Sequence, residues 1–146
     1  MRIQIRTKVG ASLKEIKKGF TEDLFLSLNP PFPPVKLKQF DGCSAGDEVI
    51  LELNFLLFKQ VWKSEIVEET ETEVSWHFID VGVKLPFFLK KWKHHHGVEH
   101  EESGSTIIDD ITFSTGTILS DLVMYPLLYG QFLYRKPIYK KTFEKT

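Results

Sequence analysis

The sequence predicts an α+β fold in which a strongly curved antiparallel sheet of about seven strands wraps around a long C-terminal helix. Apolar and polar residues alternate over residues 2–9 and again in consecutive segments between residues 35 and 114. A period of two is typical of half-buried strands. Two short helical segments lie between these regions, and apolar residues recur at helical spacing after residue 117. A sheet that wraps around the last helix buries all of these apolar faces at once.

Local signals predict one strand and two short helices at the N-terminus. Arg2–Val9 alternates between polar and apolar residues and is expected to form a half-buried strand. Ser12 and Glu15 form a capping-box pattern, in which each side chain accepts a hydrogen bond from the other residue's backbone, so a helix should follow. Gly19 interrupts this helix, and Glu22–Leu28 resumes it. The proline-rich segment that follows ends the second helix, because proline has no backbone donor.

Six further strands are predicted from alternation alone. They comprise residues 35–40, 47–55, 58–68, 74–80, 89–101 and 105–114. Strict alternation in consecutive strands favours an antiparallel sheet with one buried and one solvent-facing surface. We expect the acidic run Glu68–Glu73 to be a solvated hairpin tip, and Cys43, in a Gly/Ser turn, to be an unreactive thiol.

The last third of the chain is expected to form the long helix. Apolar residues at steps of three and four define its buried side, namely Tyr125, Leu128, Phe132, Ile138 or Tyr139, and Phe143. Pro126 suits the first turn of a helix, and Pro137 should kink the helix about midway. The basic segment Arg135–Lys145 is expected to be a solvated face that opposes the helix dipole.

Length and composition describe one ordinary domain, residues 1–146. Apolar residues make up 42% of the chain and charged residues 27%, which excludes global disorder. The net charge of -1 gives no overall field that would attract nucleic acid. No apolar signal segment follows Arg2, and the least charged stretch, residues 117–134, is shorter than the ~20 residues of a membrane span. We therefore expect a cytoplasmic monomer or homodimer with no nucleic-acid partner.

Three segments carry a resemblance to a known superfamily. The stretch Leu89–His96, rich in Trp and His, precedes Gly104–Phe113, which reads Gly-Ser-Thr-Ile-Ile-Asp-Asp-Ile-Thr-Phe. This pair is similar to the sixth and seventh strands of bacterial SRPBCC (START and Bet v 1-like) proteins, with Ser105 where Thr is usual and Phe113 where Tyr is usual. Phe132–Arg135 resembles the closing helix of that superfamily. The resemblance implies the helix-grip fold, with an apolar cavity between the sheet and the long helix.

The cavity implied by this resemblance would bind a small hydrophobic or amphipathic ligand. Its expected lining consists of inward-facing residues of the strands and the long helix: Leu51, Leu53, Phe55, Gln60, Trp62, Trp76, Phe78, Trp92, His94, His96, Ile107, Asp109, Ile111, Phe113, Leu128 and Phe132. The same residues could instead form a filled core. Inward-facing polar residues, among them Gln60 and Asp80, favour a cavity, because a filled core rarely contains several polar groups.

The three consecutive histidines suggest a metal site, but strand geometry argues against one. On a strand His94 and His96 share a face, whereas His95 points the opposite way. Asp109 on the next strand could add a carboxylate, yet no helical His-Glu-x-x-His motif is present. We expect no metal and no cofactor. His94 or His96 could simply pair with Asp109 and neutralise it.

A catalytic version of the same cluster remains open. His94, His96 and Asp109 could act as acid and base in a polyketide cyclase- or dehydratase-like enzyme. A third possibility is an interaction module with an exposed apolar patch. The sequence has no recognised catalytic motif, so it favours binding of a small hydrophobic ligand without catalysis, and no catalytic residue is assigned.

Overall fold

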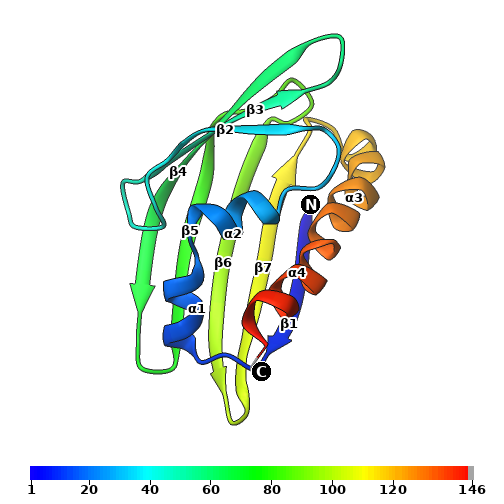
Figure 1. The fold of residues 1–146 in the computed structure, drawn as a ribbon. Coiled ribbons are helices and arrows are strands. Elements are labelled where there is room, and N and C mark those ends of the chain that lie inside the picture. Colours follow the sequence, from blue (N-terminus) through cyan, green and yellow to red (C-terminus); the bar gives the residue numbers. More distant parts are fainter. Residues whose placement is uncertain (145–146) are drawn as a thin grey trace.

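The computed structural model describes residues 1–144, which form one sheet of seven strands and four helices (Figure 1). The chain order is β1 (Arg2–Val9), α1 (Leu13–Gly19), α2 (Glu22–Ser27), β2 (Val35–Phe40), β3 (Glu48–Asn54), β4 (Lys59–Glu71), β5 (Ser75–Lys84), β6 (Lys91–Glu101), β7 (Gly104–Ser114), α3 (Ile118–Leu133) and α4 (Arg135–Phe143). The predicted α+β class and the predicted order of elements are confirmed.

All seven strands belong to one antiparallel sheet with the order β1-β7-β6-β5-β4-β3-β2. The first strand therefore pairs with the last, and the others follow the chain as a meander. In Figure 1, α1 and α2 cross in front of the sheet while α3 and α4 run along the side of β1 and β7. This arrangement leaves one concave face covered by helices and one face exposed to solvent.

The short helices begin where their caps predict. Ser12 and Glu15 form the complete capping box at the start of α1, and the Thr21 side chain accepts from Leu24 N–H at the start of α2. Gly19 ends α1 beside Phe143, and a Cβ added at Gly19 would lie 2.5 Å from the Phe143 ring. Glycine is therefore needed here so that α1 and α4 can approach closely.

The long C-terminal helix differs from its prediction at its start. Thr117 caps α3, so Pro126 lies inside the helix and not in its first turn. The prediction was wrong because the cap signal of Thr117 with Ser120 lies a full two turns before Pro126. Pro137 acts as expected: its missing N–H would have bonded to the carbonyl of Leu133, where α3 ends and α4 follows after a break at Tyr134.

The prediction for the acidic run Glu68–Glu73 also needs correction. β4 continues to Glu71, so most of the acidic run belongs to a strand rather than to the hairpin tip. Glu69 in this run accepts a hydrogen bond from Trp76 Nε1 at 2.9 Å. Its carboxylate therefore accepts the hydrogen bond of a buried indole N–H and is not merely solvated.

No helix within residues 1–144 is both long enough and apolar enough to cross a membrane.

Candidate functional site

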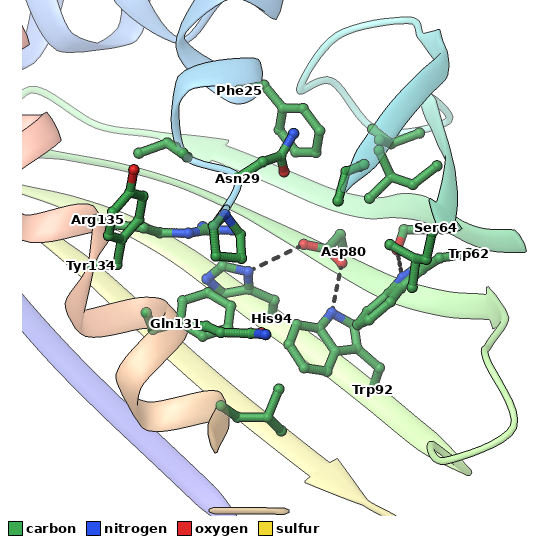
Figure 2. Close-up of a pocket in the computed structure, with 18 of the residues that line it drawn as sticks. Phe25, Asn29, Trp62, Ser64, Asp80, Trp92, His94, Gln131, Tyr134 and Arg135 are labelled. Atoms are coloured by element: carbon green, nitrogen blue, oxygen red, sulfur yellow. Dashed lines mark hydrogen bonds and ion pairs between the residues drawn. The ribbon is translucent and has the colours of Figure 1, made fainter. Parts of the chain in front are cut away.

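A pocket of about 900 Å³ lies between the concave face of the sheet and the helices (Figure 2). Strands β2 to β6 form its floor, while α2, the proline-rich loop after α2, α3 and the start of α4 form its other walls. Aromatic and aliphatic side chains make up most of these walls, including Leu24, Phe25, Leu28, Phe32, Val49, Leu51, Leu53, Phe55, Phe87, Phe88, Leu127, Leu128 and Phe132. A concave, mainly apolar site with few polar groups is typical of small-molecule pockets.

Polar side chains gather on one wall of this pocket. Asp80 on β5 lies directly opposite His94 on β6, because these two residues pair in the strand register. The Asp80 carboxylate accepts from Trp92 Nε1 at 3.1 Å, and its other oxygen lies 2.8 Å from His96 Nε2. That second oxygen is also 3.6 Å from His94 Nδ1. Figure 2 shows His94 and Trp92 both directed at Asp80.

A second carboxylate supports this wall from behind. The Asp109 side chain on β7 is only 2% exposed, and its Oδ1 lies 2.9 Å from His94 Nε2. The same oxygen is 3.4 Å from the Arg135 guanidinium, which also lies over the Phe132 ring. Arg135, Asp109, His94, Asp80 and His96 thus form one continuous series of contacts, called here the buried polar cluster.

Burial and partners together set the protonation states of this cluster. Burial opposes ionisation of Asp109, but the hydrogen bond from His94 and the charge of Arg135 outweigh it and hold the Asp109 pKa below its usual value. Burial likewise opposes ionisation of Asp80, while contacts with His96 and His94 lower its pKa overall. Burial lowers the pKa of His94 to about 4, so at neutral pH this imidazole is uncharged between two carboxylates.

Two tryptophans flank the cluster inside the pocket. The rings of Trp62 and Trp92 meet edge to face with their centroids 4.7 Å apart. Trp62 Nε1 donates to Ser64 Oγ at 2.9 Å, and Trp92 donates to Asp80, so both indole donors are satisfied. Aromatic side chains whose polar ends are fixed in this way provide rigid apolar walls.

The structure brings ten of the predicted lining residues to the pocket and places six elsewhere. The ten are Leu51, Leu53, Phe55, Trp62, Phe78, Trp92, His94, His96, Leu128 and Phe132. The six are Gln60, Trp76, Ile107, Asp109, Ile111 and Phe113. Five of these six are buried in the predicted inward register, but their side chains fill the core beside the pocket. Gln60 instead accepts from Phe87 N–H near the surface.

The sequence left open whether His94 or His96 pairs with Asp109, and in the structure the partner is His94. His96 lies directly opposite Asp109 in the strand register. Its Nε2 nevertheless contacts Asp80, and His94 is the histidine that contacts Asp109. The two imidazole rings lie 3.5 Å apart, centroid to centroid. Each histidine thus makes its shortest contact with a different carboxylate, although His94 Nδ1 also lies 3.6 Å from Asp80.

Sequence reasoning missed Arg135, which it assigned to a solvated basic face. The Arg135 side chain is only 14% exposed and lines the pocket. A signal was present: Leu128, Phe132, Arg135 and Tyr139 follow one another at steps of four, three and four. That spacing places Arg135 on the buried side of the helix.

Sequence reasoning also missed the second wall of the pocket. The proline-rich loop was interpreted only as the end of α2, yet residues 29–33 line the pocket, as do Phe87 and Phe88 from the β5–β6 connection. No local pattern indicates this role, because it depends on where the loops pack. Cys43 also lines the pocket, and burial raises the pKa of its thiol to about 12, in keeping with the predicted lack of reactivity.

Solved structures share this fold over nearly the whole chain. The di-domain ARO/CYC StfQ from the steffimycin biosynthetic pathway matches 97% of the chain with a TM-score of 0.70 and 10% identity. The chain spans half (50%) of the length of StfQ. Norcoclaurine synthase of Thalictrum flavum, a point mutant in complex with a transition-state analogue, matches 97% of this chain and 92% of its own, with a TM-score of 0.66 and 13% identity.

A third similar structure is that of Ara h 8.0201, which matches 94% of this chain and 96% of its own, with a TM-score of 0.59 and 13% identity. No protein-family profile and no curated protein sequence matches the chain. At such low identities the structural likeness shows the fold alone. That fold is the Bet v 1-like helix grip, so the fold implied by the sequence resemblance is confirmed.

Proposed function

From its Bet v 1-like helix-grip fold and its pocket, we propose that this protein binds a small hydrophobic or amphipathic molecule between the sheet and the C-terminal helices. The observation that carries the proposal is the pocket itself. Its volume of about 900 Å³ lies within the range of roughly 300–1,000 Å³ that small-molecule sites occupy. Its walls are mainly apolar, so burial of an apolar ligand there is favourable.

The position of the polar groups suggests how the ligand is oriented. Asp80, His94, His96 and Arg135 lie together on one side, whereas the walls formed by α2 and β3 are apolar. An amphipathic molecule would place its apolar body against the walls formed by α2 and β3, and its hydrogen-bonding end against the polar side chains. Two of the similar structures support a small-molecule role, since StfQ is from a biosynthetic pathway and the norcoclaurine synthase structure contains a transition-state analogue.

The test is a binding titration with a pocket-filling variant. Native mass spectrometry of freshly purified protein first identifies any co-purified small molecule. Delipidated protein is then titrated with 1-anilinonaphthalene-8-sulfonate (ANS), an aromatic probe with one charged group. Leu53 is buried in the pocket wall, so Leu53→Phe fills part of the pocket and should weaken probe binding at least tenfold. Leu57 is 95% exposed, and Leu57→Phe is the matched control.

Saturable binding with one site, at least tenfold weaker in Leu53→Phe and unchanged in Leu57→Phe, supports the proposal. Equal affinities for the two variants would place the probe outside the pocket and contradict the proposal. The same conclusion would follow if the wild-type protein bound neither the probe nor any co-purified molecule.

A further inference from the structure

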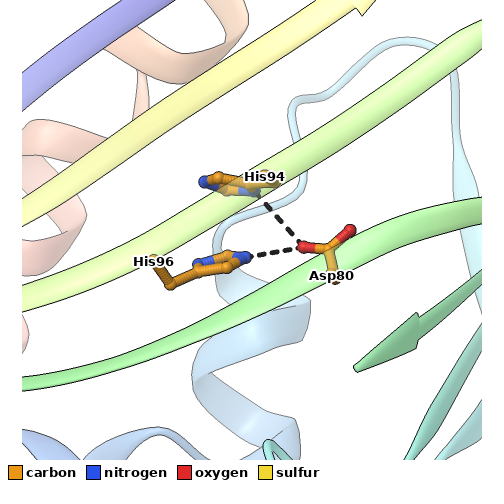
Figure 3. A group of neighbouring side chains, drawn as sticks. All are labelled: Asp80, His94 and His96. Atoms are coloured by element: carbon orange, nitrogen blue, oxygen red, sulfur yellow. Dashed lines mark hydrogen bonds and ion pairs between the residues drawn. The ribbon is translucent and has the colours of Figure 1, made fainter. Parts of the chain in front are cut away.

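Three potential metal ligands converge at the pocket wall. Asp80, His94 and His96 each offer one donor atom, and these three atoms lie within 4.8 Å of one another. Figure 3 shows both imidazoles directed at the same oxygen of Asp80. The side chains of His94 and His96 are 3% and 13% exposed. Three converging donors that are shielded from bulk water and border a pocket make a more specific arrangement than three polar residues at a surface.

The separations of these atoms suit a metal ion. Two ligand atoms that each lie about 2.1 Å from a metal are about 3.0 Å apart at a right angle and about 3.4 Å apart at a tetrahedral angle. The Asp80 oxygen lies 2.8 Å from His96 Nε2 and 3.6 Å from His94 Nδ1. All three atoms lie within 4.8 Å of one another, so side-chain adjustments would bring them to coordinating distance.

Two of the three ligands, His94 and Asp80, are oriented by neighbouring hydrogen-bonding groups, as metal ligands usually are. His94 Nε2 contacts Asp109 at 2.9 Å, and an imidazole that donates to this carboxylate presents its lone pair at Nδ1, toward Asp80. Without a cation, that lone pair faces a carboxylate oxygen at 3.6 Å, too far for a hydrogen bond. Trp92 holds the other oxygen of Asp80. A carboxylate behind the histidine and a donor on the carboxylate ligand are common features of metal sites.

We propose that Asp80, His94 and His96 bind a divalent first-row transition metal ion, such as zinc or iron, whose remaining coordination positions face the pocket. Two imidazoles favour such an ion over magnesium or calcium, which prefer oxygen ligands. The sequence predicted no metal because only two of the three histidines share a face of the strand and no helical ligand pair is present, and Asp80 was not considered as a ligand. The structure places Asp109 behind His94 and brings Asp80, from the other neighbouring strand, to the front.

Cobalt is a suitable probe for this site, because Co²⁺ bound to nitrogen ligands absorbs visible light. Wild-type protein freed of metal by dialysis against a chelator, followed by removal of the chelator, should bind one equivalent of Co²⁺ and release it to Zn²⁺ but not to a 100-fold excess of Mg²⁺. Asp80→Asn and His96→Gln remove ligands and should weaken binding at least 100-fold. Asp109→Asn disturbs only the support of His94, so a loss of about 10–100-fold is expected.

His95→Gln is the matched control. His95 lies on the same strand but faces the opposite side, where its ring contacts His77. Its substitution should leave Co²⁺ affinity unchanged. A second measurement needs no variant: in wild-type protein, paramagnetic Co²⁺ should shift the ring-proton NMR signals of two of the five histidines.

Three results would overturn the metal site. These are no stoichiometric binding of Co²⁺ or Zn²⁺ to wild-type protein, equal weakening by His95→Gln and His96→Gln, and displacement of Co²⁺ by Mg²⁺. The metal site goes beyond the proposed binding of an apolar molecule and does not depend on it. If metal binding fails while ANS still binds in the pocket, only the metal site is refuted.

Discussion

Asp109 shows how one buried residue depends on its partners. Its carboxylate is ionised in the core because His94 and Arg135 both contact it. Asp109→Ala removes one member of this buried group and leaves Arg135 without its anionic partner. We expect the free energy of unfolding to fall by about 3–5 kcal/mol. Asp109→Asn keeps the shape and part of the hydrogen bonding, so it should cost less. Urea denaturation measures both variants.

Asp110 provides the matched control for this prediction. It lies next to Asp109 but faces the other side of the sheet, where Arg2 and Gln4 contact it. Pairs of this kind near the surface contribute little to stability, so Asp110→Ala should be much less damaging than Asp109→Ala. If the order of the two variants were reversed, the inferred role of Asp109 in the core would be wrong.

His94 predicts how stability changes with pH. Its pKa is about 4 in the folded protein and 6.5 in the unfolded chain. Between these values the unfolded chain binds a proton that the folded protein does not, so the free energy of unfolding decreases as the pH falls through this range. From pH 7 to pH 5, His94 should account for a loss of about 2 kcal/mol.

The measurement is urea denaturation at several pH values, with a chelator present so that no metal competes for the imidazole. His94→Gln should make the dependence on pH shallower between pH 5 and 7. His100→Gln, at an exposed position of the same strand, is the control and should leave the slope as in the wild type. An unchanged slope in His94→Gln would contradict the buried, uncharged state of His94.

The fluorescence of the three tryptophans should respond differently when a molecule binds in the pocket. The sequence predicts all of them beside one cavity, but the structure places only Trp62 and Trp92 there. Trp76 packs on Phe20, with ring centroids 5.4 Å apart, in the neighbouring core. Binding of ANS should therefore change the intrinsic fluorescence of Trp76→Phe as much as that of the wild type, and change that of Trp62→Phe or Trp92→Phe less. A response that disappeared only in Trp76→Phe would contradict this placement.

At the scale of elements, the contact between α1 and α4 depends on one glycine. Gly19→Ala would place a methyl group 2.5 Å from the ring of Phe143, which is 5% exposed and has little room to move. Such overpacking typically costs 1–3 kcal/mol. Gly130 in α3 is the control, because nothing outside its own helix lies within 4 Å of an added Cβ. Gly130→Ala should stabilise the protein by up to about 1 kcal/mol, and thermal denaturation compares the two.

The same elements show which parts of the fold are local in origin. The capping box of Ser12 and Glu15 and the alternation of Arg2–Val9 predict α1 and β1 with their observed starts, because both signals act between neighbours in sequence. Pro126 was expected in a first turn, but it lies inside α3, which begins at Ile118. Packing of α3 against β1 and β7 allows an interior proline that an isolated helix would not tolerate.

At the scale of the whole molecule, the pocket should couple ligand binding to stability. Its walls come from strands and helices distant in the sequence, so an unfolded chain has no such site. A ligand that binds only the folded protein stabilises it by about 2.7 kcal/mol at a concentration of 100 times its Kd. ANS at that concentration should therefore raise the free energy of unfolding of the wild type by this amount. In Leu53→Phe at the same probe concentration the increase should be smaller.

Strand alternation, helix caps and prolines act over a few residues, so they are enough to predict the order of elements, the antiparallel sheet and the inward register. The sequence also indicated that His94, His96 and Asp80 face inward. The folded chain places Asp80 opposite His94, Asp109 behind His94, and Arg135 beside Asp109 in the cluster. These contacts join β5, β6, β7 and α4, and their geometry depends on strand pairing and helix packing, which no local pattern specifies.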